Sequence, residues 1–120
     1  YYSSNLKNCG LNVAITEDRD SFKNGCWATT IVINEEYFSS ELTINNMHKI
    51  SIPLRPFFRP LSSMPAYSCY RNHDTAIPKV SNYLFKKGLT LPSHYDLTKE
   101  HIDFISEHLI TEINSQRESY

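Results

Sequence analysis

Four prolines between positions 53 and 65 exclude a helix from the middle of this 120-residue chain. Proline lacks a backbone N–H and disfavours helical geometry in the residue before it, so Pro53 and Pro56 keep the segment 52–58 extended. Pro60 and Pro65, among several Ser and Tyr residues, predict an ordered loop over 59–72. Helices therefore belong to the two flanking parts of the chain.

Two further segments are predicted to be strands. Residues 26–33 are rich in β-branched and aromatic side chains and follow the turn signal Asn24-Gly25. A shorter strand is expected at 89–92, directly after Gly88. With the extended segment 52–58, the sheet would have about three strands, whose directions the sequence does not predict.

Helices are predicted between and beside these strands. Residues 1–8 resemble the end of a helix, which Gly10 would stop. Ser39 or Ser40 can cap a helix to about Lys49, with Ile44 and Met47 on its inner face. A third helix is expected over 75–87, with Pro78 in its first turn and Val80 and Leu84 facing inward.

The clearest helix begins near residue 98. Thr98 is a good N-cap, and Leu97 with Ile102 matches a hydrophobic staple. The inner face is one apolar stripe, made of Ile102, Ile105, Leu109 and Ile113. The polar residues 114–120 are expected to fray. The sequence thus predicts one domain over 1–120 of the α/β (α+β) class, a small sheet of about three strands packed with helices.

Composition excludes several classes of function. The formal net charge is −1, so no general attraction to nucleic acid or to an anionic membrane is expected. No apolar run approaches the roughly 20 residues of a transmembrane helix. The three cysteines, Cys9, Cys26 and Cys69, lack C-x-x-C spacing, which argues against a disulfide framework or a cysteine-rich zinc site. Free thiols fit a cytoplasmic protein.

No complete catalytic site is visible. The chain has three glycines and no G-x-S-x-G, Walker or G-x-G-x-x-G motif. His101 and His108 lie seven residues apart on one helix, without the i, i+4 spacing of a zinc site, and are interpreted as exposed polar residues. The pair His73-Asp74 could suggest an acid/base dyad, but helix capping by Asp74 is the favoured interpretation. No metal site is predicted.

The most unusual stretch is Arg55-Pro56-Phe57-Phe58-Arg59-Pro60-Leu61-Ser62-Ser63-Met64-Pro65-Ala66-Tyr67. Prolines stiffen the backbone, aromatic rings give flat apolar walls, and arginine offers a bidentate donor to phosphate. That combination suits a sugar or a nucleotide diphosphate. A proline-rich crossover whose phenylalanines fill the core is the competing interpretation.

The same stretch resembles the R-P-F-F-x-P-L-S-S-x-P segment of the DegT/DnrJ/EryC1/StrS aminotransferases, in its perosamine-synthase-like form. Two further motifs follow in register. The segment from Asn24 to Ile33 looks like the N-x-x-W strand of that family, and 88–98 looks like its G-[LI]-x-L-P-S…D-L-T ending. The resemblance covers nearly the whole chain. Many relatives have His where Ser62 stands, which leaves the substrate open.

The resemblance implies the small C-terminal domain of a type I pyridoxal-phosphate enzyme acting on nucleotide-linked keto sugars. It implies substrate contacts for Phe57, Phe58 and Arg59, and motif positions for Arg55 and Trp27. The Schiff-base lysine and the other cofactor contacts would lie in a larger N-terminal domain. None of the lysines here falls at the family position for that role, so this chain alone is expected to bind no pyridoxal phosphate and to have no catalytic residue.

Three hypotheses about function remain open. In the first, the chain is the C-terminal part of a sugar aminotransferase, inactive alone and working with the missing domain and a second copy as a cytoplasmic homodimer. Alternatively, it is a free-standing module that binds nucleotide sugars or supports assembly without catalysis. A decayed remnant of the enzyme is the third possibility.

Overall fold

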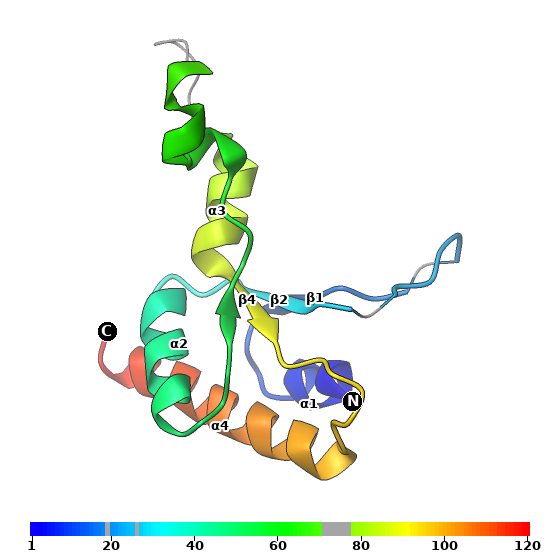
Figure 1. The fold of residues 1–120 in the computed structure, drawn as a ribbon. Helices are drawn as coiled ribbons and strands as arrows, with labels where there is room; N and C mark the ends of the chain where they lie inside the picture. Colours follow the sequence, from blue (N-terminus) through cyan, green and yellow to red (C-terminus); the bar gives the residue numbers. More distant parts are fainter. Residues whose placement is uncertain (19, 26, 71–77) are drawn as a thin grey trace.

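Four antiparallel strands form a single sheet in the order β1-β2-β4-β3 (Figure 1). The computed structural model describes residues 1–18, 20–25, 27–70 and 78–120. Its strands are β1 (Val13–Ile15), β2 (Thr29–Ile33), β3 (Arg55–Pro56) and β4 (Gly88–Leu91). The three strands predicted correspond to β2, β3 and β4, whereas β1 was not predicted. The fold is of the α+β class.

The two faces of the sheet differ because side chains alternate along each strand. Val13 pairs with Ile33, and Ile31 pairs with Leu89, so apolar side chains gather on one face. The other face presents smaller or more polar side chains: Ala14, Thr30, Val32 and Thr90. Only the apolar face can drive packing against helices.

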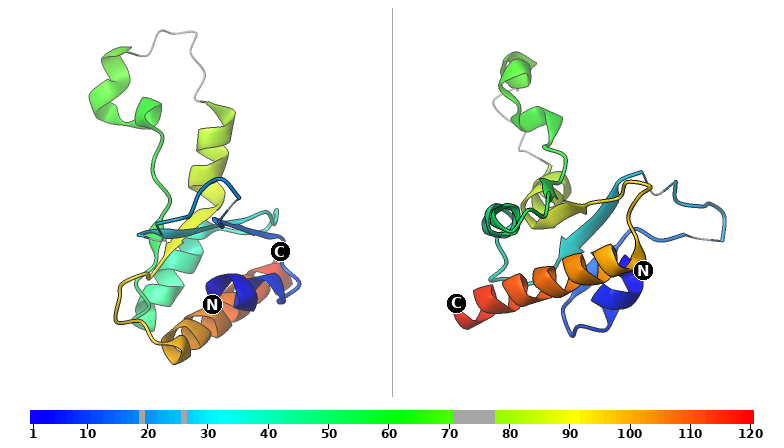
Figure 2. Two further views of the ribbon diagram at one scale, coloured as in Figure 1. Left: turned by 90° about the vertical axis from the view of Figure 1, so that its right-hand side faces the viewer. Right: turned by 60° about the horizontal axis from the view of Figure 1, so that its bottom comes forward.

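Three helices cover that apolar face: α1 (Tyr2–Lys7), α2 (Ser40–Lys49) and α4 (Lys99–Glu118) (Figure 2). The core between sheet and helices holds Tyr2, Leu6, Ile31, Ile33, Phe38, Met47, Ile52, Leu54, Leu89, Leu91, Ile105, Leu109 and Ile113. The predicted apolar stripe of the last helix is confirmed, since Ile105, Leu109 and Ile113 are buried and Ile102 packs beside them. No helix within the described ranges is both long and apolar enough to span a membrane.

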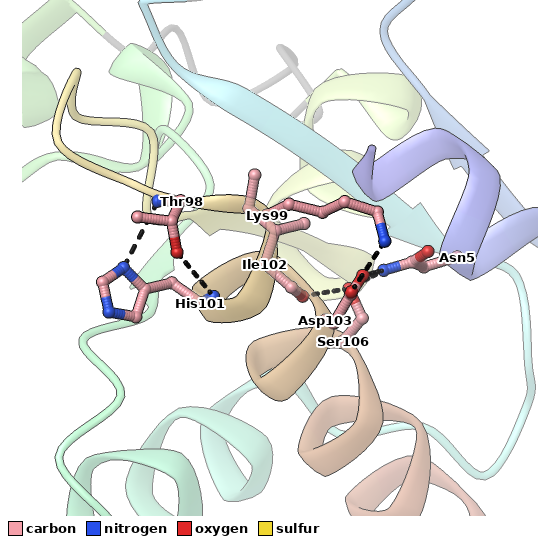
Figure 3. Close-up of polar contacts among 7 residues, drawn as sticks. All are labelled: Asn5, Thr98, Lys99, His101, Ile102, Asp103 and Ser106. Atoms are coloured by element: carbon pink, nitrogen blue, oxygen red, sulfur yellow. Dashed lines mark hydrogen bonds and ion pairs between the residues drawn. The ribbon is translucent and has the colours of Figure 1, made fainter.

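Two of the predicted helix starts, those of α2 and α4, are confirmed by their caps. The Ser39 hydroxyl accepts a hydrogen bond from the N–H of Leu42 at 3.3 Å. Thr98 accepts from the N–H of His101 at 3.3 Å, and the N–H of Thr98 donates to Nδ1 of His101 at 3.3 Å (Figure 3). His101 is exposed, as expected, but it also completes a reciprocal capping box with Thr98. The third residue of such a helix is usually Glu or Gln.

Helix α4 continues to Glu118, so the frayed tail predicted over 114–120 is wrong for most of its length. The reason is Gln116, which is 8% exposed and joins α4 to α2. Its amide nitrogen donates to the hydroxyl of Thr43 at 2.8 Å, and its carbonyl accepts from the N–H of Ser39 at 2.8 Å. A polar side chain with both ends satisfied can be buried without loss of stability, which a hydrophobicity pattern does not reveal.

Two parts of the chain project from this body. Helix α3 (Lys79–Lys87) and the segment that carries the 3-10 helices η1 (Leu61–Ser63) and η2 (Pro65–Tyr70) rise on the side of the sheet opposite α4 (Figures 1 and 2). Val80 is 71% exposed, so the prediction that it faces inward is wrong, because α3 extends beyond the sheet. Leu84 is half-buried. The predicted helix start at 75–77 lies outside the described residues.

Candidate functional site

The proline-rich segment reaches the sheet through a very short strand. In β3, Arg55 pairs with Thr90 and Pro56 pairs with Leu89. Pro56 can occupy this position because β3 is an edge strand, where a missing N–H removes no ladder bond on the open side. Leu54 is buried just before the strand, while Arg55 is exposed. The short pairing therefore fixes where the guanidinium group of Arg55 leaves the sheet.

An exposed aromatic cluster lies beside this strand. The rings of Trp27 and Phe58 have centroids 6.3 Å apart, and those of Phe58 and Phe57 are 5.9 Å apart in an edge-on arrangement. Trp27 is 78% exposed and Phe58 is 62% exposed. The hydroxyl of Ser93 donates to the carbonyl of Trp27 at 3.0 Å, which ties the end of the loop before β2 to the segment after β4. Residues far apart in sequence thus meet at one surface.

Around this cluster lies a hollow of about 390 Å³, here called the Arg55 hollow. Its lining comprises Trp27, Ala28, Pro53, Arg55, Pro56, Phe58, Thr90, Leu91, Pro92, Ser93 and His94. Aromatic rings and prolines form apolar walls, and the polar groups are hydroxyls, a guanidinium and an imidazole. Among the described residues, no acidic side chain belongs to that lining. Such a surface suits a ligand with a ring and a negative charge.

Arg59 belongs to a different hollow. Its guanidinium carbon lies 5.3 Å from the ring centroid of Phe85 on α3. The hollow there, of about 640 Å³, is here called the Arg59 hollow and is lined by Phe38, Ser39, Ser40, Glu41, Ile44, Asn45, Pro56, Arg59, Phe85, Lys86 and Lys87. Pro56 lines both hollows, which the end of β3 therefore separates.

The structure thus divides the five residues predicted to contact substrate. Trp27, Arg55 and Phe58 line one hollow and Arg59 lines the other. Phe57 belongs to neither lining and packs against Gly88, where an added Cβ would lie 2.8 Å from the Cβ of Phe57. The sequence analysis did not propose Thr90, Ser93 or His94 for the site. Thr90 is the partner of Arg55 within β4, and Ser93 and His94 follow that strand, so a strand pairing that the sequence does not reveal brings them to the site.

Lysine side chains are the groups that could anchor pyridoxal phosphate covalently. A Schiff-base lysine needs a desolvated pocket that keeps it reactive. Lys7, Lys23, Lys49, Lys79, Lys86 and Lys99 are exposed, and the half-buried Lys87 donates to three backbone carbonyls. Within this chain by itself, none of the described lysines lies in such a pocket. The described residues also contain no group of three or more His, Cys, Asp or Glu side chains that could hold a metal ion.

Other candidates have simple placements. His108 packs its ring on Phe104, with centroids 4.1 Å apart, and Nδ1 lies 2.9 Å from the carbonyl oxygen of Phe104. Cys9 is a free thiol. Cys26 and the pair His73-Asp74 lie outside the described residues, and so does the side chain of Cys69.

Around α1, the pKa values of three side chains, Tyr2, Glu17 and Asp103, are shifted from their ordinary values. Burial raises the pKa of Tyr2 to about 12. The side chain of Asn5 donates to Oδ1 of Asp103 at 2.8 Å, and this hydrogen bond, with help from Lys99, lowers the pKa of Asp103 (Figure 3). Hydrogen bonds from Lys7 and Ser3 likewise lower the pKa of Glu17. These carboxylates hold elements together and line neither hollow.

Asp103 gives a pH prediction. Its pKa is lower in the folded state, so its contribution to stability is present above the unfolded pKa, near 4, and is lost as pH falls through the folded pKa. We expect the unfolding free energy to fall below about pH 4, and to fall less in Asp103→Asn. Urea unfolding at a series of pH values measures both slopes. Asn5→Ala removes the main donor and should also flatten the dependence; equal slopes in all three proteins would contradict the assignment.

Comparison of the sequence with models of known families identifies the family. A sequence profile of the DegT/DnrJ/EryC1/StrS aminotransferase family matches residues 1–110. The chain belongs to this family. Comparison with proteins of curated function gives no match.

Solved structures share the fold of this DegT/DnrJ/EryC1/StrS chain. Spr1654 of Streptococcus pneumoniae, described as a sugar aminotransferase and solved in a PLP form, is 23% identical with a TM-score of 0.81, over 96% of this chain and 29% of that one. PseC of Helicobacter pylori, an aminotransferase of pseudoaminic acid biosynthesis, is 17% identical with a TM-score of 0.81, over 95% and 30%. The sugar dehydratase ColD, bound to GDP-perosamine, is 17% identical with a TM-score of 0.70, over 91% and 28%. The chain thus spans about three tenths of these relatives.

Proposed function

We propose that this chain forms the substrate-facing wall of a nucleotide-sugar aminotransferase. The observation that carries the proposal is the meeting of Arg55 with the exposed rings of Trp27 and Phe58 around one hollow, in a member of an aminotransferase family. A guanidinium group recognises phosphate oxygens, and aromatic rings pack on the apolar face of a sugar or a base. The reaction would move an amino group from glutamate to a 3-keto or 4-keto nucleotide sugar.

In this proposal the chain works joined to a larger domain that holds pyridoxal phosphate, in a cytoplasmic homodimer. Two observations support a covering partner. The chain spans 29% of Spr1654, and large apolar side chains are exposed between β1 and β2, after β3 and on the projecting parts, among them Phe22, Trp27, Phe58, Leu61, Tyr67, Val80 and Tyr83. Monomeric proteins seldom leave so much apolar surface to water.

Titration calorimetry of a protein that contains this chain together with the larger domain, with GDP-mannose and with UDP-N-acetylglucosamine, tests the binding. We expect one of these probes to bind, and Arg55→Gln to weaken its binding by about 10-fold or more, because a charge-assisted hydrogen bond is lost. Arg117→Gln is the matched control, since Arg117 lies in the last turn of α4. Arg59→Gln reports on the other hollow. If neither probe gave a heat of binding at millimolar concentration, the proposed binding would be wrong.

A stand-alone binding module is the second candidate, because the Arg55 hollow forms within this chain without any other domain. The two candidates differ in the cofactor. A protein that contains this chain together with the larger domain should show the visible absorbance of bound pyridoxal phosphate. Binding of nucleotide sugar without that absorbance would favour the module.

A further inference from the structure

The ammonium group of Lys87, the last residue of α3, makes three hydrogen bonds. It donates to the backbone carbonyls of Glu35 at 2.7 Å, Glu36 at 3.1 Å and Phe38 at 2.9 Å. It also lies 5.9 Å from the centroid of the Phe38 ring. An ammonium has three N–H donors, so these three carbonyls use all of them. Lys87 therefore acts on the loop between β2 and α2 and has no donor left for a ligand.

Helix α3 has few other attachments to the body. None of its residues is buried, in contrast to α1, α2 and α4. The hydroxyl of Tyr83 donates to Oδ1 of Asn34 at 2.7 Å, at the start of the same loop, but this contact is exposed. Its apolar side chains Leu84 and Phe85 are only half-buried, so α3 gains less from the hydrophobic effect than a helix with fully buried side chains, and polar contacts of this kind contribute more to its direction.

Direct contacts connect α3 to residues that line both hollows. Phe85 on α3 lies under the guanidinium group of Arg59. At the junction of α3 with β4, Gly88 packs so closely on Phe57 that no side chain fits between them. From Phe57 the ring contacts continue to Phe58 and then to Trp27.

We propose that Lys87 is a positioning residue: its ammonium group fastens α3 to the loop 34–38 and thereby sets where Arg59 and Phe58 stand at the two hollows. The part of this proposal that concerns ligand affinity rests on the proposed function. The part that concerns the direction of α3 does not, and it can be tested without any ligand.

Lys87→Met is compared with Lys86→Met, which removes the neighbouring exposed lysine from the same last turn and so controls for the loss of charge near the helix C-terminus. Hydrogen exchange is followed in α3 and in the core of α4. In Lys87→Met we expect amides of 82–87 to exchange about 10-fold faster or more, with α4 unchanged, because a local opening no longer breaks charge-assisted hydrogen bonds. Lys86→Met should exchange like the parent chain.

The single tryptophan gives a second readout, since Trp27 is the end of the chain of rings. Its fluorescence anisotropy should decay faster in Lys87→Met than in the unchanged chain. Lys87→Arg restores a cation with several donors, so it should return the hydrogen exchange of α3 and the anisotropy decay toward the values of the unchanged chain. Equal behaviour of the Lys87 and Lys86 variants, or faster exchange throughout α4, would overturn the proposal.

A ligand experiment separates the two proposals. In a protein that joins this chain to the larger domain and binds one of the nucleotide-sugar probes, Lys87→Met should weaken that binding without touching the ligand, and Lys86→Met should weaken it less. If that two-domain protein binds neither probe, the proposed function fails, while the exchange and anisotropy results still decide whether Lys87 fixes α3.

Discussion

Truncating Leu109 to alanine is expected to lower the free energy of unfolding by about 2–5 kcal/mol. Leu109 is 0% exposed and lies in the middle of the buried stripe of α4. The substitution removes apolar contacts and leaves a cavity between α4 and the sheet, which the surrounding elements can fill only in part. Urea unfolding followed by circular dichroism gives the change, provided that the slope with denaturant stays constant.

The chain contains its own control for this change. Leu42 lies on α2 and is 47% exposed, so Leu42→Ala makes the same chemical change where little area is buried. Surface substitutions of this kind usually stay within about 0.5 kcal/mol. Equal destabilisation by the two leucine substitutions would show that α4 does not pack as described.

Gly88→Ala is expected to cost about 1–3 kcal/mol through crowding alone. A Cβ at this position would lie 2.4 Å from the carbonyl oxygen of Leu84 and 2.8 Å from the Cβ of Phe57. The backbone at Gly88, with φ −95° and ψ 145°, is open to any residue, so the penalty comes from the neighbours and not from the dihedral angles. Since the contact with Leu84 is to backbone, the helix end itself has to move. Urea unfolding measures the loss.

Gly25→Ala provides the matched comparison. A Cβ at Gly25 would meet no other atom of the described residues within 4 Å. Replacing glycine by alanine in open space is neutral or slightly stabilising, because the unfolded chain loses freedom. If Gly88→Ala proved as harmless as Gly25→Ala, then α3, β4 and Phe57 would not meet as closely as described.

Local signals allowed the sequence to predict most of the fold. The caps Ser39 and Thr98 act within one helical turn, so they could be identified from neighbouring residues, and the structure confirms both. The apolar stripe of α4 was predicted for the same reason. Strand β1 was missed because three residues, Val13–Ile15, give no measurable alternation. Strand order and direction depend on contacts between distant segments, which no local pattern contains.

The errors in α3 and at the C-terminus have a common cause. Val80 and Leu84 have the spacing of an inner helical face, but α3 projects beyond the sheet and has no inner side at Val80. Gln116 looks like part of a polar tail, yet Thr43 and Ser39 meet its two ends. Burial was inferred from residue type in both cases, whereas it depends on what the rest of the fold places nearby.

The candidate site was predicted as residues of the segment 55–59 together with Trp27, and the structure divides these residues between two surfaces. Arg55 and Arg59 are four residues apart, and a short edge strand directs them to different hollows. Only tertiary structure brings Trp27, Ser93 and His94 to Arg55. The sequence therefore predicted which side chains could contact a ligand, but not which of them line the same hollow.

The shortness of β3 has a consequence for how this domain can associate with other chains. Two residues, one of them a proline, leave almost no row of free N–H and C=O groups along that edge of the sheet. An incoming strand would find too few backbone partners to extend the ladder there. Association at this edge must then rely on side-chain complementarity, which favours a particular partner surface over indiscriminate β-aggregation.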